Sequence, residues 1–189
     1  MHRRTATKVK DGRVQKKNNW APDPGDYWAV APDEIVFDRV RPAPGRRHVV
    51  NKAQVLRVLH LLPDWDVVAV GLRAILLDDE PGCFGWYDDG VVALCDWDHD
   101  LWIEHEDWFL EEHAHIFELL DIDVVGTEVR YTEEQARAFM LLHILPHELG
   151  HHHDRMSTRS KWRSPRGESY AEDYANRALE VLWPLYSSE

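Results

Sequence analysis

The sequence predicts an α+β fold, in which a small mixed or antiparallel sheet packs on helices. Segments rich in β-formers lie mainly in the first two thirds of the chain, and one of them, GWYDDGVVALC, contains the Asp-Gly turn of a hairpin. Helical periodicity and helix-start signals dominate the last third. The 189 residues, 44% of them hydrophobic, suffice for one domain with its own core.

Charge divides the chain into two parts. Residues 1–19 hold seven Lys or Arg and one Asp and so carry +6, whereas the whole chain carries −12, which leaves −18 for the remainder. The composition predicts a disordered basic arm at 1–19 and a single domain at 20–189. An acidic body repels nucleic acid and anionic membranes, so nucleic-acid binding is not expected except through the arm.

The first elements of the domain are a strand and a helix. EIVFDRVR (34–41) alternates apolar and polar residues as a strand does, and PAPG then turns the chain. Asn51 is placed to cap a helix over 52–62, where apolar residues recur at helical spacing until Pro63 ends it.

The middle of the chain predicts further strands and one helix. DVVAVGLRAILLDD (66–79) is rich in branched residues, which indicates one bent strand or two short ones, and the hairpin follows at 85–95. The apolar residues of 104–122 fall into one stripe, so we expect an amphipathic helix there, followed by a strand at 124–131.

Two helices close the chain. Thr132 and Gln135 match the capping box that begins a helix, and this helix continues through LPHELGHHHDR (145–155). After the loop STRSKWRSPRG, we expect a final helix over 168–186, with Pro184 near its end.

Composition also indicates a compartment. No stretch approaches the roughly 20 apolar residues that cross a bilayer, and the basic N-terminus has no apolar segment behind it, as a signal peptide has. The two cysteines, Cys83 and Cys95, are too few for a disulfide framework and fit a reducing environment. We therefore expect a cytoplasmic protein without membrane partners.

The chemistry is concentrated in 145–155, where His147-Glu148-Leu149-Gly150-His151 forms an HExxH motif. At about 100° per residue, helix positions four apart differ by roughly 40° and lie one turn above each other, so both imidazoles can bind one ion. Glu148 lies about 100° round the helix from His147, where it can bond a water at the open metal position. We predict His147 and His151 as metal ligands and Glu148 as general base.

Zinc suits these residues. It binds neutral imidazole and carboxylate tetrahedrally and lowers the pKa of its bound water to about 7, which prepares that water to attack a carbonyl carbon. Gly150 is expected to allow close packing on its side of the helix. Pro146 cannot donate to the carbonyl of Leu142, so it should kink the helix or begin a new segment.

Through HELGHH (147–152), the last part of the chain resembles the zincin metallopeptidases. Residues 175–179, Ala-Asn-Arg-Ala-Leu, add a looser likeness to the ImmA/IrrE group of that superfamily. The resemblance implies a zinc-dependent peptidase. In zincins whose third ligand is a glutamate, that residue lies on a following helix about twenty residues after the second histidine. Glu172 fits this spacing best and Glu168 is the alternative; whichever does not bind zinc could orient a ligand histidine.

Other polar residues near the motif have expected roles that support the three predicted ligands and the base. Asp154 is expected either to accept a bond from a ligand imidazole or to pair with Arg155, and Tyr170 or Tyr174 is the candidate donor to a developing oxyanion. His153 is a minor candidate for catalysis, and Cys83 is expected to be a structural thiol. Three more histidines are expected on the surface: His105, His113 and His115.

The function predicted is hydrolysis of peptide bonds in a peptide or protein substrate, which would lie extended beside an edge strand, with VVALC as the candidate. The alternative is a zinc-binding regulatory or interaction module with little or no proteolytic activity. Glu148 favours catalysis, because a purely structural site does not need a carboxylate there. The sequence does not determine the oligomeric state.

Overall fold

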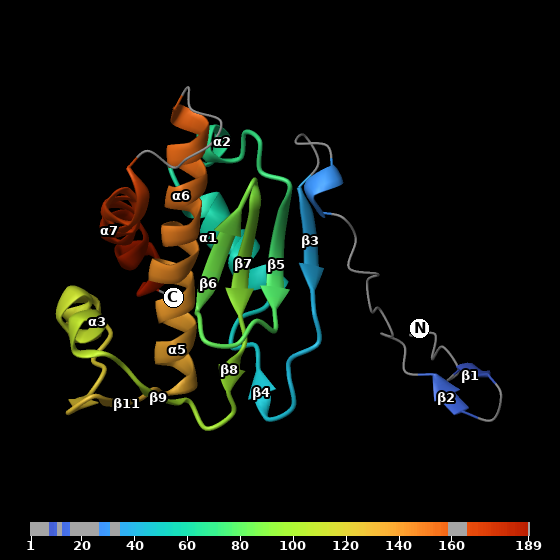
Figure 1. The fold of residues 1–189 in the computed structure, drawn as a ribbon, viewed down its shortest axis with the longest axis horizontal. Helices are drawn as coiled ribbons and strands as arrows, with labels where there is room; N and C mark the ends of the chain where they lie inside the picture. Colours follow the sequence, from blue (N-terminus) through green and yellow to red (C-terminus); the bar gives the residue numbers. More distant parts are fainter. Residues whose placement is uncertain (1–7, 11–12, 16–26, 31–34, 159–165, 189) are drawn as a thin grey trace.

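The computed structural model describes residues 8–10, 13–15, 27–30, 35–158 and 166–188, and it confirms an α+β fold (Figure 1). A mixed four-stranded sheet consists of β3 (Val36–Arg39), β5 (Ala74–Asp78), β7 (Val91–Cys95) and β6 (Gly85–Asp88), in that order. β3, β5 and β7 run parallel, and β6 is antiparallel to β7. β6 is therefore an edge strand, and β7 lies inside the sheet.

The β6–β7 hairpin confirms the sequence prediction. Gly85 pairs with Leu94 and Asp88 with Val91, which leaves a two-residue turn at Asp89 and Gly90. Both turn residues have positive φ, 38° and 89°, as the twist of a two-residue hairpin requires.

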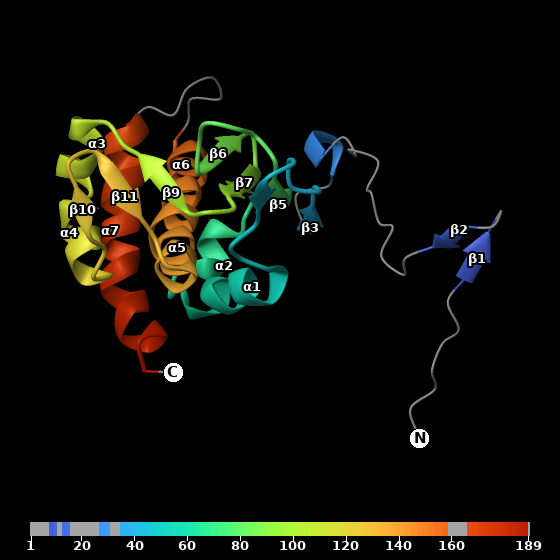
Figure 2. The same cartoon turned by 90° about the horizontal axis from the view of Figure 1, so that it is seen from below.

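Helices cover one face of the sheet. The inward side chains of β5 and β7 join one core with α1 (Lys52–Leu61), α5 (Glu133–Phe139) and α6 (Leu145–Ser157). α7 (Gly167–Tyr186) packs against α6 on the side away from β6, so α6 lies between the sheet edge and α7 (Figures 1 and 2). The opposite sheet face carries a smaller cluster that includes Tyr27, from the 3₁₀ turn Tyr27–Ala29, and Trp86.

Both predicted helix starts are confirmed. The side chains of Asn51 and Thr132 each accept a bond from the backbone N–H three residues on, and Gln54 and Gln135 return it, so both starts are capping boxes. The final helix also agrees within one residue with the expected 168–186.

Two predicted elements are wrong. In 66–79 only β5 is a strand. Residues Trp65–Val68 form the short helix α2, in which Val68 is buried while Val67 is 60% exposed. Gly71, with φ +82°, then turns the chain before the buried Leu72. The helix expected at 104–122 is broken at His113 into α3 (Asp107–Glu112) and α4 (Ala114–Leu119).

The segments before α3 and after α4 form a small second sheet. β9 (Trp102–Glu104) pairs with β11 (Glu128–Arg130), which pairs with β10 (Val124–Val125), so the strand expected at 124–131 is a hairpin that turns at Gly126, with φ +64°. Two short pairs complete the described strands: β4 (Arg46–Arg47) with β8 (Trp97–Asp98), and β1 (Lys8–Lys10) with β2 (Arg13–Gln15).

The rest of the predicted basic arm lies outside the described residues. Within the described part, no helix combines the length and apolar character needed to cross a bilayer.

The helix that carries the HExxH motif changes type before the proline. Between α5 and α6 lies a π-helical segment, η2 (Met140–Ile144), and the N–H of Leu145 bonds to the carbonyl of Met140, five residues back. Pro146 then occupies the first turn of α6, where its missing N–H costs least. Of the two outcomes expected at Pro146, a kink or a new segment, the structure has a new segment: the α-helix α6 begins at Leu145.

Candidate metal centre

Three side chains converge at the surface between α6 and α7. Nε2 of His147 lies 3.2 Å from Nε2 of His151 and 3.2 Å from Oε2 of Glu168, and Nε2 of His151 lies 3.4 Å from the same carboxylate oxygen. Metal bonds of about 2.0–2.1 Å in a tetrahedral arrangement separate ligand atoms by about 3.3–3.4 Å. The triangle thus has the dimensions of three corners of a zinc site.

The triangle lies at the protein surface. The side chain of Glu168 is 84% exposed, whereas those of His147 and His151 are 19% and 14% exposed. A metal held by three protein ligands at a surface keeps a fourth position that water or a substrate carbonyl can occupy.

Glu172, the predicted third ligand, is not in this triangle. Its Oε2 lies 3.2 Å from Nδ1 of His147, so the imidazole donates to Glu172 and keeps the lone pair of Nε2 directed at the triangle. Glu168 and Glu172 are four residues apart on α7 and therefore reach opposite edges of the same imidazole. The geometry favours Glu168 as ligand and Glu172 as the group that orients His147.

These contacts are reflected in the pKa values. Burial lowers the pKa of His147, but the hydrogen bond to Glu172 and the nearby carboxylates more than offset this, so the pKa is raised. Burial alone would raise the pKa of Glu172, yet the His147 bond and the neighbouring imidazoles bring it down to about 2. Glu172 is therefore a carboxylate that can hold His147 in one orientation.

Glu148 occupies a restricted position beside the edge strand. It is 6% exposed, and burial raises its pKa to about 8. A Cβ on Gly85 of β6 would lie 2.9 Å from Oε1 of Glu148 and 2.9 Å from the carbonyl oxygen of Ala93. Glycine at position 85 therefore leaves room for this carboxylate, and β6 lies directly against Glu148.

Close contact between α6 and α7 brings Glu168 and Glu172 to the motif. A Cβ on Gly150 would lie 2.8 Å from Cα of Ala171, so the expectation that Gly150 allows close packing is confirmed. Such an approach places successive turns of α7 directly against the histidine-bearing turns of α6.

Asp154 fixes the start of α7. It is fully buried and accepts bonds from Nε of Arg166 (2.7 Å) and from the backbone N–H groups of Arg166 (3.0 Å) and Gly167 (3.2 Å). We expected Asp154 to bond a ligand imidazole or to pair with Arg155, and neither expectation anticipated its bonds to Arg166 and Gly167. Asp154 instead caps the helix that begins one residue before Glu168.

The remaining candidates have other partners. The hydroxyl of Tyr170 lies 2.6 Å from Nδ1 of His153, and that of Tyr174 donates to Asp64, so neither tyrosine is directed at the triangle. His152 donates from Nε2 to the carbonyl of Val70. Sγ of Cys83 lies 3.3 Å from Sγ of Cys95, and both are free thiols.

Two histidines that sequence reasoning did not assign to a site gather near Glu172. His143 was not singled out, although it lies four residues before His147 as His147 lies before His151. His113, expected on the surface, is 6% exposed, and His105 is 7% exposed, so for these two that expectation is wrong; His115 is exposed as predicted. The four-residue spacing of His143, His147 and His151 was the signal in the sequence that could have identified His143.

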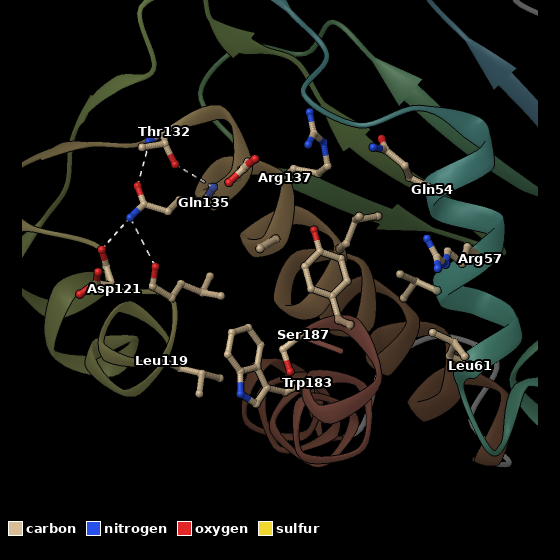
Figure 3. A pocket seen from close by; sticks show the side chains of 16 residues that line it. Gln54, Arg57, Leu61, Leu119, Asp121, Thr132, Gln135, Arg137, Trp183 and Ser187 are labelled. Carbon is tan, nitrogen blue, oxygen red and sulfur yellow. Dashed lines mark hydrogen bonds between the residues drawn. The ribbon is translucent and has the colours of Figure 1, made fainter. Parts of the chain in front are cut away.

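A separate pocket lies away from these side chains, between α1, α5 and the C-terminal end of α7 (Figure 3). It has a volume of about 610 Å³ and is lined by aliphatic groups together with Arg57, Arg137, Trp183 and Tyr186. None of the histidines or glutamates of the triangle lines it.

Comparison of the chain with protein-family models, with curated proteins and with solved structures gives no match. The assignment of this site therefore depends on the positions and chemistry of its own side chains.

Proposed function

We propose that this protein is a zinc-dependent peptidase, with Zn²⁺ held by His147, His151 and Glu168. The observation that carries the proposal is the triangle of two imidazole nitrogens and one carboxylate oxygen with edges of 3.2–3.4 Å. Its dimensions and its donor atoms both suit tetrahedral zinc.

Each residue has a separate part in the reaction. Bound zinc would supply Lewis acidity, which lowers the pKa of a water at the open corner and polarises the substrate carbonyl. Glu172 holds His147 with Nε2 directed outward. Glu148 removes a proton from the attacking water and then delivers it to the leaving amine nitrogen.

The raised pKa of Glu148 supports this role. A carboxyl group with a pKa of about 8 holds its proton near neutral pH in the metal-free protein. A divalent cation beside it favours the carboxylate and lowers that pKa. Glu148 can then both accept and release a proton at the pH at which zinc-bound water ionises.

The substrate strand would lie along β6. The predicted strand, Val91–Cys95, is excluded because it is paired on both sides. The N–H of Cys95 bonds to the carbonyl of Phe84, so alternation directs the main-chain groups of Gly85 and Tyr87 to the edge of β6 that pairs with no described strand. An extended peptide bonded there would pass beside Glu148.

Glu148→Gln tests the reaction against the alternative of a zinc-binding module without catalysis. We expect unchanged zinc content and folding, and a loss of peptide hydrolysis by several orders of magnitude, because the water loses its base. Zinc content by elemental analysis and cleavage of quenched fluorescent peptides are the measurements, and Glu180→Gln, an exposed site on α7, is the matched control.

If wild-type protein loaded with zinc cleaves no peptide in a broad library, the interaction-module alternative holds. If it cleaves peptides and Glu148→Gln does so equally well, the base is misassigned.

A further inference from the structure

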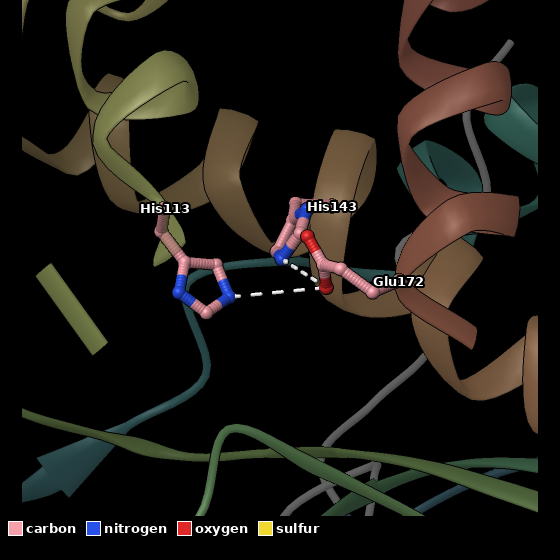
Figure 4. Close-up of side chains that lie close together, drawn as sticks. All are labelled: His113, His143 and Glu172. Carbon is pink, nitrogen blue, oxygen red and sulfur yellow. Dashed lines mark ion pairs between the residues drawn. The ribbon is translucent and has the colours of Figure 1, made fainter. Parts of the chain in front are cut away.

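We propose that His113, His143 and Glu172 form a second, buried transition-metal site, adjacent to the first. The three come from different elements: the junction of α3 and α4, the π-helical segment η2, and α7 (Figure 4). Their ligand atoms all lie within 4.8 Å of one another.

The distances leave room for an ion between these groups. Oε2 of Glu172 lies 3.6 Å from Nε2 of His143 and 4.0 Å from Nε2 of His113, too far for hydrogen bonds. Ligands of one tetrahedral ion lie about 3.3–3.4 Å apart, so these two distances would shorten by about 0.2–0.7 Å on coordination. Figure 4 shows both Nε2 atoms directed at the same carboxylate oxygen.

The tautomer of His113 is fixed in the form that a metal requires. Its Nδ1 donates to the carbonyl of Phe109 over 2.8 Å, so in the neutral ring Nε2 carries a lone pair that faces Glu172. Ligand histidines are commonly held in this way by a backbone carbonyl at the other nitrogen.

His143 lacks a hydrogen-bond partner in the described structure. It is 1% exposed, and neither of its ring nitrogens forms a hydrogen bond with the described residues. A buried imidazole without partners loses the free energy of hydration, which a metal bond from Nε2 would restore. Burial also favours the neutral ring, which is the form that binds metals.

The donor set indicates the class of ion. Two imidazoles and one carboxylate suit Zn²⁺, Fe²⁺ and related transition metals, whereas Mg²⁺ and Ca²⁺ prefer oxygen ligands. Glu172 would belong to both sites, because the oxygen facing His113 and His143 is also the one bonded to Nδ1 of His147. Occupation of the second site would thus act on the orientation of His147.

Metal stoichiometry tests this site. Untagged, metal-free protein is saturated with Zn²⁺ and dialysed, and the zinc per chain is measured. We expect two ions in the wild type, one in His113→Leu and one in His143→Leu, and two in the control His115→Leu, which removes an exposed histidine on α4. Circular dichroism checks that each variant folds.

Anomalous diffraction at the zinc edge on the wild type gives a second test that needs no variant. A peak about 2.0–2.2 Å from Nε2 of both His113 and His143 supports the site. A bridging water without anomalous signal, or two ions retained in both variants, overturns it. If His151→Ala keeps one ion that His143→Leu loses, and the wild type binds no other, the second site stands and the proposed catalytic site fails.

Discussion

The two glutamates of α7 differ by one helical turn and have different partners. Oε2 of Glu168 lies 3.2 Å from Nε2 of His147, and Oε2 of Glu172 lies 3.2 Å from Nδ1 of the same ring. Sequence spacing identified both residues, but it could not assign them. Which glutamate reaches which nitrogen depends on the axial position of α7, and this position is set by Asp154, Arg166 and Gly150 rather than by any pattern within α7.

Replacement of these glutamates should separate a ligand from an orienting group. Glu168→Gln removes a charged group from the proposed catalytic site, so we expect the zinc affinity of that site to fall by more than 100-fold. Glu172→Gln leaves the three proposed ligands in place and should lower the affinity by about 10- to 100-fold. Peptide hydrolysis as a function of free zinc concentration reports the affinity of this site in each variant. The reverse order of the two effects would restore Glu172 as the third ligand.

Gly85 should be required for the position of Glu148, the proposed general base. In Gly85→Ala the new methyl group would meet Oε1 of Glu148 and the carbonyl oxygen of Ala93, each at 2.9 Å. Of these two groups, the Glu148 side chain can move more easily than the backbone carbonyl. We therefore expect Glu148 to be displaced and kcat to fall at least 10-fold, with zinc content unchanged. Steady-state kinetics and elemental analysis on the same sample are the measurements. Unchanged kcat would show that the strand adjusts instead.

At the level of elements, the close contact of α6 with α7 should be visible in stability. Gly→Ala in an exposed helix stabilises by about 1 kcal/mol, because alanine has the higher helix propensity. At Gly150 the added Cβ would instead lie 2.8 Å from Cα of Ala171, so we expect Gly150→Ala to destabilise by about 1–3 kcal/mol. Urea unfolding of the metal-free protein measures this difference. A stabilised variant would show that the helices separate at little cost.

The start of α7 gives a second test at this level. Asp154→Asn removes the charge that accepts three bonds from Arg166 and Gly167, so the first turn of α7 should fray and Glu168 should lose its fixed position. We expect weaker zinc binding, with hydrolysis recovered at high zinc concentration because Glu148 is unaffected. Activity that stays low at saturating zinc would place Asp154 in the reaction itself.

Prediction from sequence succeeded where the signal is local. The capping boxes at Asn51 and Thr132, the Asp-Gly hairpin and the proximity of the His147 and His151 imidazoles each depend on residues close together in the sequence. It failed at 66–79 and at 104–122, where tertiary packing overrides propensity: Val68 and Leu72 are buried together, and His113 turns inward at a helix break. Contacts between distant segments, such as Gly85 with Glu148, have no local signal.

For the whole molecule, the buried imidazole of His105 should make the free energy of unfolding depend on pH. His105 stacks on Phe109, with ring centroids 4.6 Å apart, and burial lowers its pKa to about 4. The unfolded chain, with a histidine pKa of about 6.5, binds this proton more readily. Stability from His105 is therefore present above pH 6.5 and is lost as the pH falls towards 4.

Variant and wild type should thus differ in their pH response. Between pH 7.5 and pH 4.5, we expect the free energy of unfolding of the wild type to decrease by about 2–3 kcal/mol more than that of His105→Phe. This variant keeps an aromatic ring at position 105 and removes the titrating group. Urea unfolding at both pH values measures this difference, and the use of a difference cancels the other buried histidines. Equal decreases would assign the acid sensitivity elsewhere.

β6 pairs with β7 on one side and with no described strand on the other, which affects association between copies of the chain. An unpaired strand is a template on which a second molecule can add its own strand and begin to aggregate. β6 limits this hazard because it is only four residues long and ends in the charged Asp88, and because Gly85 at its start has low intrinsic β-propensity. An edge strand of four residues can form only a few main-chain hydrogen bonds, so it favours pairing with a long, flat strand of another molecule only weakly.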